Sequence, residues 1–325
     1  MNPRYVQAAI VAAAGVFAVA WALLGPPSVA TAALVVGSAA MPMAIVLAVS
    51  GLVDRNPPWM AGVGGGTIGV GIALAGHAVV FAFAYIFFLG FAKAGVEILD
   101  VLRVDPSLTA VAGSPWTMLL LIELVAVAPL TEELGKAVGA SLSRPADRPS
   151  AFMAGVAAGS GFAVAENILY ALGGGFLGSS WEAIVLGRML GAAVHPLASG
   201  LVVMGWWEWR QDRDLGRLAR RFLAGAGVHA LWNGSIVVLG IVATAYGSAA
   251  FDGSGLVSLA YSAALGAVAG AVLWRTAVSV AVGDDRTVPF DAGDARVVAA
   301  WTVLAASFVV PVAMLVLAFP EFVGR

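Results

Sequence analysis

Apolar runs of about 20 residues recur along the whole chain, and short segments between them carry most of its charge. A helix needs about 20 apolar residues to cross about 30 Å of hydrocarbon. The runs do not alternate polar and apolar positions in segments of about ten, as the strands of a membrane barrel do. The pattern therefore predicts an all-α, polytopic bundle of transmembrane helices.

We expect about nine spans, within a range of about eight to ten. The predicted spans are residues 5–24, 28–53, 66–91, 115–141, 150–172, 182–208, 222–246, 255–274 and 298–318. A run of glycines at residues 64–66 interrupts an uncharged stretch longer than one span, so we expect a bend or a re-entrant start there. The longest connections, 93–114 and 275–297, are modest. Residues 1–325 are therefore predicted to form a single integral membrane domain.

The composition excludes several classes of protein. Of the 325 residues, 61% are hydrophobic and 11% are charged, and the mean hydropathy is +0.94. A soluble domain carries about 25% charged residues, so a water-soluble enzyme and a disordered chain are both excluded. A net charge of −2 provides no basic field for nucleic acid. The absence of cysteine excludes disulfides, thiolate nucleophiles and iron–sulfur ligands.

Basic residues in the connections predict the orientation, because they favour the cytoplasmic side. With a cytoplasmic N-terminus, the inner side holds Arg4, Arg55, Arg144, Arg148, Arg210, Arg213, Arg217, Arg220, Arg221, Arg275, Arg286 and Arg296. The outer side then holds only Lys93, Arg103 and Arg325. Arginine far exceeds lysine, and alanine, valine and glycine dominate, which hints at a GC-rich prokaryotic genome. We therefore expect a multi-pass protein of a prokaryotic plasma membrane.

Ionisable side chains inside the predicted spans are candidates for function, because a charge in hydrocarbon costs several kcal/mol unless it is paired or hydrated. They are His77, Glu123, Glu132, Glu133, Lys136, Glu166, Arg188, His195 and His229, with Asn167 and Asn233 as uncharged polar groups. Most of them lie in four consecutive spans. We therefore predict a four-helix catalytic core at 115–235, with accessory helices at 1–114 and 247–325.

The first of these four spans contains Glu132-Glu133-x-x-Lys136. Lys136 follows Glu132 by four residues and Glu133 by three, so the lysine can reach either carboxylate. The two carboxylates point about 100° apart on a helix, so one can face a cavity while the other binds Lys136 or a neighbouring helix. The simpler interpretation is an ion pair at the membrane interface.

The next three spans each bring polar groups to one face. Phe162 and Glu166 share a face, and Asn167 follows directly; Arg188 precedes His195 by seven residues, nearly two turns. His229 and Asn233 are four residues apart and project together. A lone histidine in a bundle is usually a core hydrogen-bond donor. Two histidines and three glutamates on consecutive helices favour a shared polar site instead.

Helix rise gives the approximate depth of each group. Glu132, His195 and His229 come out about 13, 20 and 10 Å from the cytoplasmic helix ends, so they can meet in that half of the bundle. Glu166 comes out about 24 Å deep, near the depth of Arg188. Glu123 and Glu166 are the candidates to neutralise Arg188. We expect Glu166 to do so either as a structural pair or as a carboxylate that Arg188 orients beneath the catalytic water.

Taken in order, these motifs resemble the PrsW family of intramembrane proteases. The resemblance rests on Glu132-Glu133-x-x-Lys136, Phe162-x-x-x-Glu166-Asn167, His195 and His229-x-x-Trp232-Asn233, and it covers about 115–235. The related CAAX-processing and bacteriocin-processing membrane proteases use EExxxR, FxxxH and HxxxN motifs. Here the basic residue, Lys136, lies one position closer to the two glutamates, and the second motif ends in Glu166-Asn167 and not in histidine. Both departures favour the PrsW family.

The resemblance implies an intramembrane endopeptidase that cleaves a membrane-anchored protein in or near its membrane segment. Membrane-anchored anti-sigma factors are the substrates that the family suggests. The lipid bilayer is the other partner that we expect, and nucleic acid is not a partner. Lys136, Phe162, Asn167 and Arg188 are expected to support the catalytic groups.

Two catalytic routes suit these residues. In the first, which we favour, no metal or other cofactor is needed. Glu132 or Glu133 is the general base for water, and His195 or His229 holds the water or protonates the leaving amine, with Glu166 nearby. Asn233 donates a hydrogen bond to the oxyanion.

In the second route, His195, His229 and Glu132 bind Zn²⁺, a ligand set that leaves one coordination position open. The sequence contains no HExxH motif to support this route. The alternative from another class is a proton- or cation-coupled transporter that uses the same buried glutamates and histidines. Inverted repeats would support a transporter, and we find none. A non-catalytic scaffold that retains the motifs is the third interpretation.

Overall fold

The computed structural model describes residues 3–24, 27–80, 82–83, 121–177, 181–246 and 254–283, and all regular structure in these ranges is helical. The α-helices are α1 (Pro3–Leu24), α2 (Pro27–Leu52), α3 (Trp59–Gly64), α7 (Ala128–Ala140), α8 (Arg148–Leu177), α9 (Trp181–Leu190), α10 (Val194–Asp212), α11 (Leu215–Tyr246) and α12 (Ser254–Val282). The short helices η1 (Gly65–Gly69), η2 (Glu123–Val127) and η3 (Ser141–Ser143) continue or precede them. The all-helical prediction is confirmed for this part of the chain.

Four helical segments of the described ranges are long and apolar enough to cross a membrane. They are Ala33–Leu52, Trp59–Val80, Arg148–Tyr170 and Leu259–Val282, and the bent pair Ile184–Leu190 and Val194–Asp212 makes a fifth if it is one broken span. The count of nine spans and the orientation of the N-terminus therefore stay predictions. The predicted span 298–318 and the connection 93–114 lie outside the described residues. The connection predicted from residue 275 starts later, because α12 continues to Val282.

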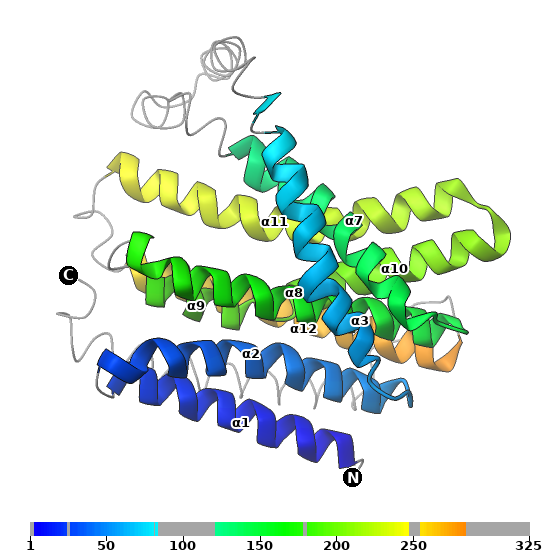
Figure 1. Ribbon diagram of the computed structural model, residues 1–325, viewed down its shortest axis with the longest axis horizontal. Coiled ribbons are helices and arrows are strands. Elements are labelled where there is room, and N and C mark those ends of the chain that lie inside the picture. The colour runs from blue at the N-terminus through cyan, green and yellow to red at the C-terminus, as the bar shows by residue number, and fades with distance from the viewer. Residues whose placement is uncertain are drawn as a thin grey trace.

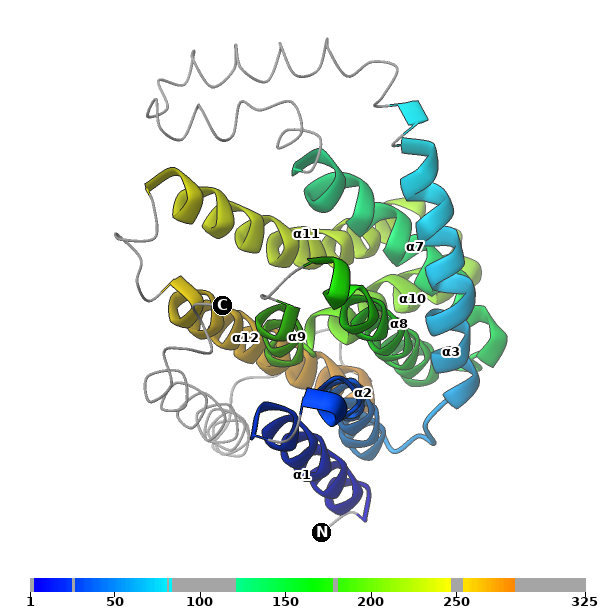
Figure 2. The ribbon, with the colours of Figure 1, turned by 60° about the vertical axis from the view of Figure 1, so that its left-hand side comes forward.

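Helix α8 lies at the centre of the bundle, where it contacts α2, α3, α7, α9, α10 and α12 (Figure 1 and Figure 2). Its first half is built from small residues, and its side chains from Ala151 to Ser160 are buried. A Cβ atom on Gly155 would overlap the backbone at Ser199, and one on Gly159 would overlap the carbonyl of His195. These glycines therefore let α8 and α10 approach closely, as small residues do between membrane helices.

We expected a span to begin at the run of glycines at residues 64–66, but the glycines lie inside a longer helix. The helix begins earlier, at Trp59, and continues to Val80 with a π-helical turn at η1. The three glycines instead make room for close neighbours, because a Cβ atom on any of them would meet backbone atoms of α7 or α8. The glycine run thus sets the distance between this helix and the two helices behind it.

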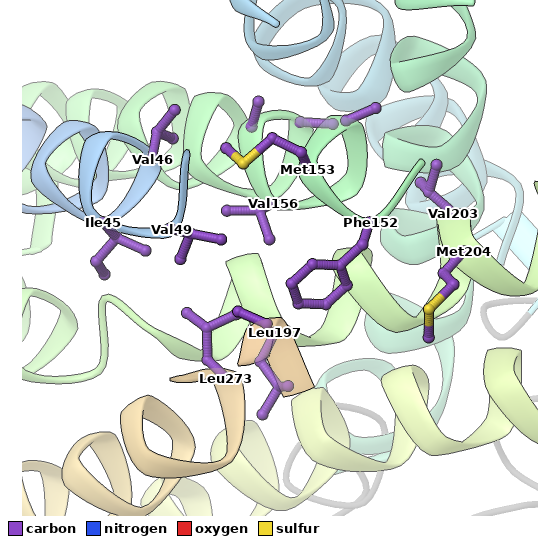
Figure 3. Close-up of a cluster of buried hydrophobic side chains, with 14 of the residues drawn as sticks. Ile45, Val46, Val49, Phe152, Met153, Val156, Leu197, Val203, Met204 and Leu273 are labelled. Atoms are coloured by element: carbon purple, nitrogen blue, oxygen red, sulfur yellow. The ribbon is translucent and has the colours of Figure 1, made fainter. Parts of the chain in front are cut away.

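The apolar core lies where α2, α8, α10 and α12 meet, and Figure 3 shows part of it. Phe152, Met153 and Val156 of α8 belong to one buried cluster with Val49 of α2 and Leu197 of α10. Lipid chains are as apolar as these side chains, so close van der Waals packing holds the helices together here. This packing makes α8 and α10 a fixed support for the polar groups above the core.

The predicted span 182–208 is interrupted, because α9 ends at Leu190, α10 begins at Val194 and the two are bent by 52°. Pro196 explains the break. Its ring would clash with the carbonyl four residues earlier, at Ala192, if the helix ran through, whereas proline is tolerated in the first turn of a new helix. The indole of Trp232 packs where a side chain on Gly191 would stand. The break places His195 in the first turn of α10.

One end of the bundle collects the charged connections. Arg4 donates to the carbonyls of Ser50 and Arg55, and Arg55 pairs with Asp147 at 2.7 Å. Glu208 near the end of α10 pairs with Arg148 at the start of α8. Arg4, Arg55 and Arg148, three of the arginines that the sequence assigns to the inner side, therefore lie at one end of the bundle.

Candidate active site

Glu132, Glu133 and Lys136 project from one side of α7 into the bundle, and all three are buried. The Nζ atom of Lys136 donates to Oε1 of Glu133 at 2.7 Å and to Oε2 of Glu132 at 3.3 Å. The lysine therefore reaches both carboxylates, as the spacing predicts. Lys136 is fully buried, so the ion-paired group is enclosed by the neighbouring helices.

Glu133 has hydrogen bonds to both of its oxygens. Its Oε1 accepts from Lys136 and lies 3.1 Å from Nδ1 of His229, and its Oε2 accepts from the hydroxyl of Ser199 at 2.8 Å. These contacts join α7 to α10 and α11. Our sequence analysis did not consider Ser199. The signal was available, since Ser199 lies four residues after His195 on the same face of α10.

Glu132 faces two histidines. Its Oε2 lies 3.6 Å from Nε2 of His229, and its Oε1 lies 3.8 Å from Nε2 of His77. Both contacts exceed hydrogen-bond distance. Glu132 therefore faces two ring nitrogens without a direct hydrogen bond to either, whereas Glu133 accepts hydrogen bonds at both oxygens.

His195 lies beside the cations of Lys136 and Arg188 and the carboxylate of Glu166. Its Nδ1 lies 2.9 Å from Nζ of Lys136, and its Nε2 lies 3.2 Å from Oε2 of Glu166. The ring of Phe162 is 5.7 Å from that of His195, and Lys136 lies over the same phenyl ring at 4.1 Å. The imidazoles of His195 and His229 meet edge to face at 4.6 Å. The two histidines thus share one site.

Glu166 belongs to this site as well as to Arg188. The expected ion pair between Glu166 and Arg188 is present, and Arg188 also lies 3.3 Å from Nε2 of His195. The Nε of Arg188 donates to Asn167 at 2.8 Å, and Asn167 in turn donates to the carbonyl of Ser38 on α2. The helix-rise depths had set Glu166 apart, but the break before α10 brings His195 to it.

Asn233 contacts a different part of the molecule. Its side-chain nitrogen donates to the carbonyl of Leu124 at 3.0 Å, in the π-helical turn η2. Within the described residues, no hydrogen bond joins it to the glutamates or the histidines. It lies one turn beyond His229 on α11, so its amide meets η2 and not α7. The oxyanion role expected for Asn233 stays a prediction that this geometry does not support.

His77 reaches the site from outside the predicted core at 115–235. It projects from the helix Trp59–Val80, pairs through Nδ1 with the buried carboxylate of Glu123, and turns Nε2 toward Glu132. The sequence analysis noted His77 and Glu123 as intramembrane groups but gave neither a role. All three histidines of the chain therefore lie within reach of Glu132.

Comparison with known proteins agrees with this constellation. A family model described as "PrsW family intramembrane metalloprotease" matches residues 70–262, more than half of the chain. The chain belongs to the PrsW family. No curated protein and no solved structure matches it.

Membership in the PrsW family shows that the chain is a multi-pass membrane protein with protease activity on a membrane-protein substrate in the bilayer. The transporter alternative is not favoured. The match starts at residue 70, so it includes His77 and the second half of the helix that carries it, which the motif comparison at 115–235 had left out.

The PrsW description names a metal, so the side chains must be tested as ligands. Glu132, His195 and His229 are buried and each offers one ligand atom, and these atoms lie within 4.8 Å of one another. The contact between Nδ1 of His229 and Glu133 is the carboxylate–histidine arrangement that orients histidine ligands. The donor set therefore fits Zn²⁺ by kind and number. Lys136 contacts two of the three ligand residues.

Proposed function

We propose that this chain is an intramembrane endopeptidase in which Glu132 activates water, while Glu133 positions the groups around it. The observation that carries the proposal is that the two carboxylates differ in how many of their oxygens accept hydrogen bonds. Both oxygens of Glu133 accept hydrogen bonds from Lys136, His229 or Ser199, whereas Oε1 of Glu132 faces His77 at 3.8 Å. A general base needs an oxygen that water can approach.

The residues around Glu132 suit a metal-free hydrolysis. When Nδ1–H of His229 donates to Glu133, Nε2 of His229 is an acceptor that can hold water beside Glu132. Glu132 takes one proton from this water while the water oxygen bonds to the carbonyl carbon of the peptide. The peptide C–N bond then breaks, and Glu132 returns the proton to the leaving amine.

His195 is a positioning group in this scheme. With Nε2–H donating to Glu166, its Nδ1 accepts from Lys136, so one neutral tautomer satisfies both contacts. The Glu166–Arg188 pair and the ring of Phe162 hold the imidazole from the other side. These contacts keep Lys136 directed toward the two glutamates, where its charge offsets theirs.

A zinc-dependent form of the same activity is the second candidate, and the grouping of Glu132, His195 and His229 favours it. Bound to these three side chains, Zn²⁺ would supply Lewis-acid activation of water. In that form Lys136 must give up its contact with His195, because a histidine lone pair serves either the ammonium or the metal. Glu133 keeps the same positioning role through His229.

The experiment uses the full chain in lipid nanodiscs and a panel of tagged single-span membrane proteins that includes anti-sigma factors, with products identified by mass spectrometry. Glu132→Gln should lower cleavage by about 100-fold or more, the loss expected when a general base is removed. Arg144→Gln, an exposed arginine in the connection before α8, is the matched surface control and should cleave normally. Normal cleavage by Glu132→Gln would end the proposal.

Metal dependence is decided on the same preparation. The metal-free form predicts that cleavage survives strong chelation and that the purified chain holds less than stoichiometric zinc. About one zinc per chain, lost in His195→Ala and His229→Ala, together with activity that chelation removes and zinc restores, would establish the second candidate.

A further inference from the structure

A cavity of about 570 Å³ lies at the charged end of the bundle, where α10 ends and α11 begins. It is lined by Glu208, Arg217, Arg220, Arg221 and Ala224. The four residues from α11 are spaced by three, one and three positions, so they form one face of that helix. The cavity therefore has a wall of guanidinium groups, and its lining residues lie between His195 and His229 along the chain.

The acidic residue in the lining is already neutralised. Glu208 is 6% exposed, its Oε1 accepts from Nε of Arg148 at 2.9 Å, and its Oε2 lies 3.5 Å from Nε of Arg221. Arg217 pairs at the rim with Asp212 at 2.6 Å and with Asp214 at 3.7 Å. Buried Glu208 is thus paired with Arg148 and with Arg221 of the cavity, so it does not oppose an anion with an unbalanced charge.

The region around the cavity keeps a net positive charge. Its basic residues are Arg148, Arg210, Arg213, Arg217, Arg220 and Arg221, and its acidic residues are Glu208, Asp212 and Asp214. Twice as many arginines as carboxylates leave an excess that attracts anions. Guanidinium groups bind phosphate oxygens through paired N–H donors, which a planar arginine presents in a fixed fork.

Tryptophans place the cavity at the depth of the lipid headgroups. Trp206 and Trp209 of α10 meet edge to face at 6.2 Å, and the guanidinium of Arg213 lies 5.2 Å from the ring of Trp209. Tryptophan is enriched at the boundary between hydrocarbon and water. The candidate broken span ends at Asp212, so we expect the residues that follow to lie at the headgroup layer.

We propose that this cavity binds the phosphate group of an anionic phospholipid from the adjacent leaflet. The volume suits a headgroup, since small-molecule sites are about 300–1,000 Å³. Arg217 and Arg220 supply the phosphate donors, and the Glu208–Arg221 pair forms the floor. The side chain of Arg221 packs on Gly205. The lipid therefore holds the end of α10 and the start of α11 at the membrane surface. These two helices carry His195 and His229.

The test counts phosphatidylglycerol retained by the full detergent-solubilised chain in native mass spectrometry, with phosphatidylcholine as the neutral comparison. The natural chain should retain phosphatidylglycerol preferentially. Arg217→Gln with Arg220→Gln should weaken retention by tenfold or more, and Arg220→Gln alone by severalfold. Arg144→Gln removes the same charge from the same end outside the cavity and should retain the lipid normally.

A second variant separates the cavity from surface charge. Ala224→Phe fills the cavity without changing the charge, so it should also weaken retention, while thermal unfolding checks that each variant folds. Unchanged retention by Ala224→Phe, or an equal loss in Arg144→Gln, would overturn the proposal by reducing it to general surface charge. Inorganic phosphate that binds as tightly as the lipid would overturn the assignment to a phospholipid.

Discussion

The Nδ1 atom of His229 lies 3.1 Å from Oε1 of Glu133, and neither residue is more than 1% exposed. This contact joins α7 to α11 at the point where both contribute to the site. The same carboxylate oxygen accepts from Lys136. Glu133 therefore fixes a histidine and a lysine at once, which separates its role from that of its neighbour Glu132.

Replacing Glu133 with glutamine should destabilise the fold more than the same change at Glu132. The amide cannot balance the buried charge of Lys136, and breaking a buried ion pair costs about 3–5 kcal/mol. Thermal unfolding of the two variants in nanodiscs measures the difference. Equal stability of both variants would show that Glu133 has no special structural role.

Two buried serines on neighbouring helices provide a matched pair. Ser199 donates to Glu133, whereas the hydroxyl of Ser160 has no hydrogen-bond partner among the residues that the structure describes. Ser199→Ala should therefore cost about 2 kcal/mol, in the range for a bond to a charged group, and should slow cleavage severalfold. Ser160→Ala should be neutral or stabilising. The prediction fails if the two variants unfold at the same temperature.

The pair of Arg188 and Glu166 calls for a double replacement. Arg188→Leu leaves a buried carboxylate without its cation and should lower stability by about 3–5 kcal/mol. Adding Glu166→Leu should restore much of it, because the two residues interact directly. The double variant should nevertheless cleave poorly, since His195 loses its Glu166 contact. A double variant that is both stable and active would confine the chemistry to the remaining residues.

Acid sensitivity is expected at the connection before α8. Partial burial would raise the pKa of Asp147, but hydrogen bonds from Arg55 and from Ser150 at the helix start outweigh it and lower the pKa to about 2 from 3.8. A carboxylate with a lowered pKa stabilises the fold above about pH 4, and this contribution is lost as the pH falls toward 2. Because the pair is half exposed, it is worth about 1 kcal/mol or less.

Asp147→Asn should remove the part of the pH dependence of stability that comes from Asp147 and leave the part that comes from other groups. Unfolding midpoints of the natural chain and the variant, measured between pH 6 and pH 2, should converge at the acid end. If the gap between them stays constant across this range, the Arg55–Asp147 pair does not titrate as described.

Hydropathy predicted that the described part of the chain is helical and that several of its helices are long and apolar enough to cross a membrane, because an apolar run is a local feature of the sequence. Contacts between helices join residues that are far apart in sequence, so hydropathy did not predict that His77 reaches the site or that His195 meets Glu166. His77 joins the site because the glycines at 64–66 let its helix approach α7 and α8. The break at Pro196 could have been anticipated from the carbonyl it blocks, and it moves His195 toward Glu166.

The bare Cα of Gly159 faces the carbonyl of His195, and even a methyl group there would overlap it. The separation between α8 and the first turn of α10 is thus set by a hydrogen atom on a residue that takes no part in the chemistry. A screen for inactive variants will consequently return Gly159 alongside the glutamates and histidines. Its substitutions will differ by their signature, since inactivation there should grow with the volume of the new side chain and not with its charge.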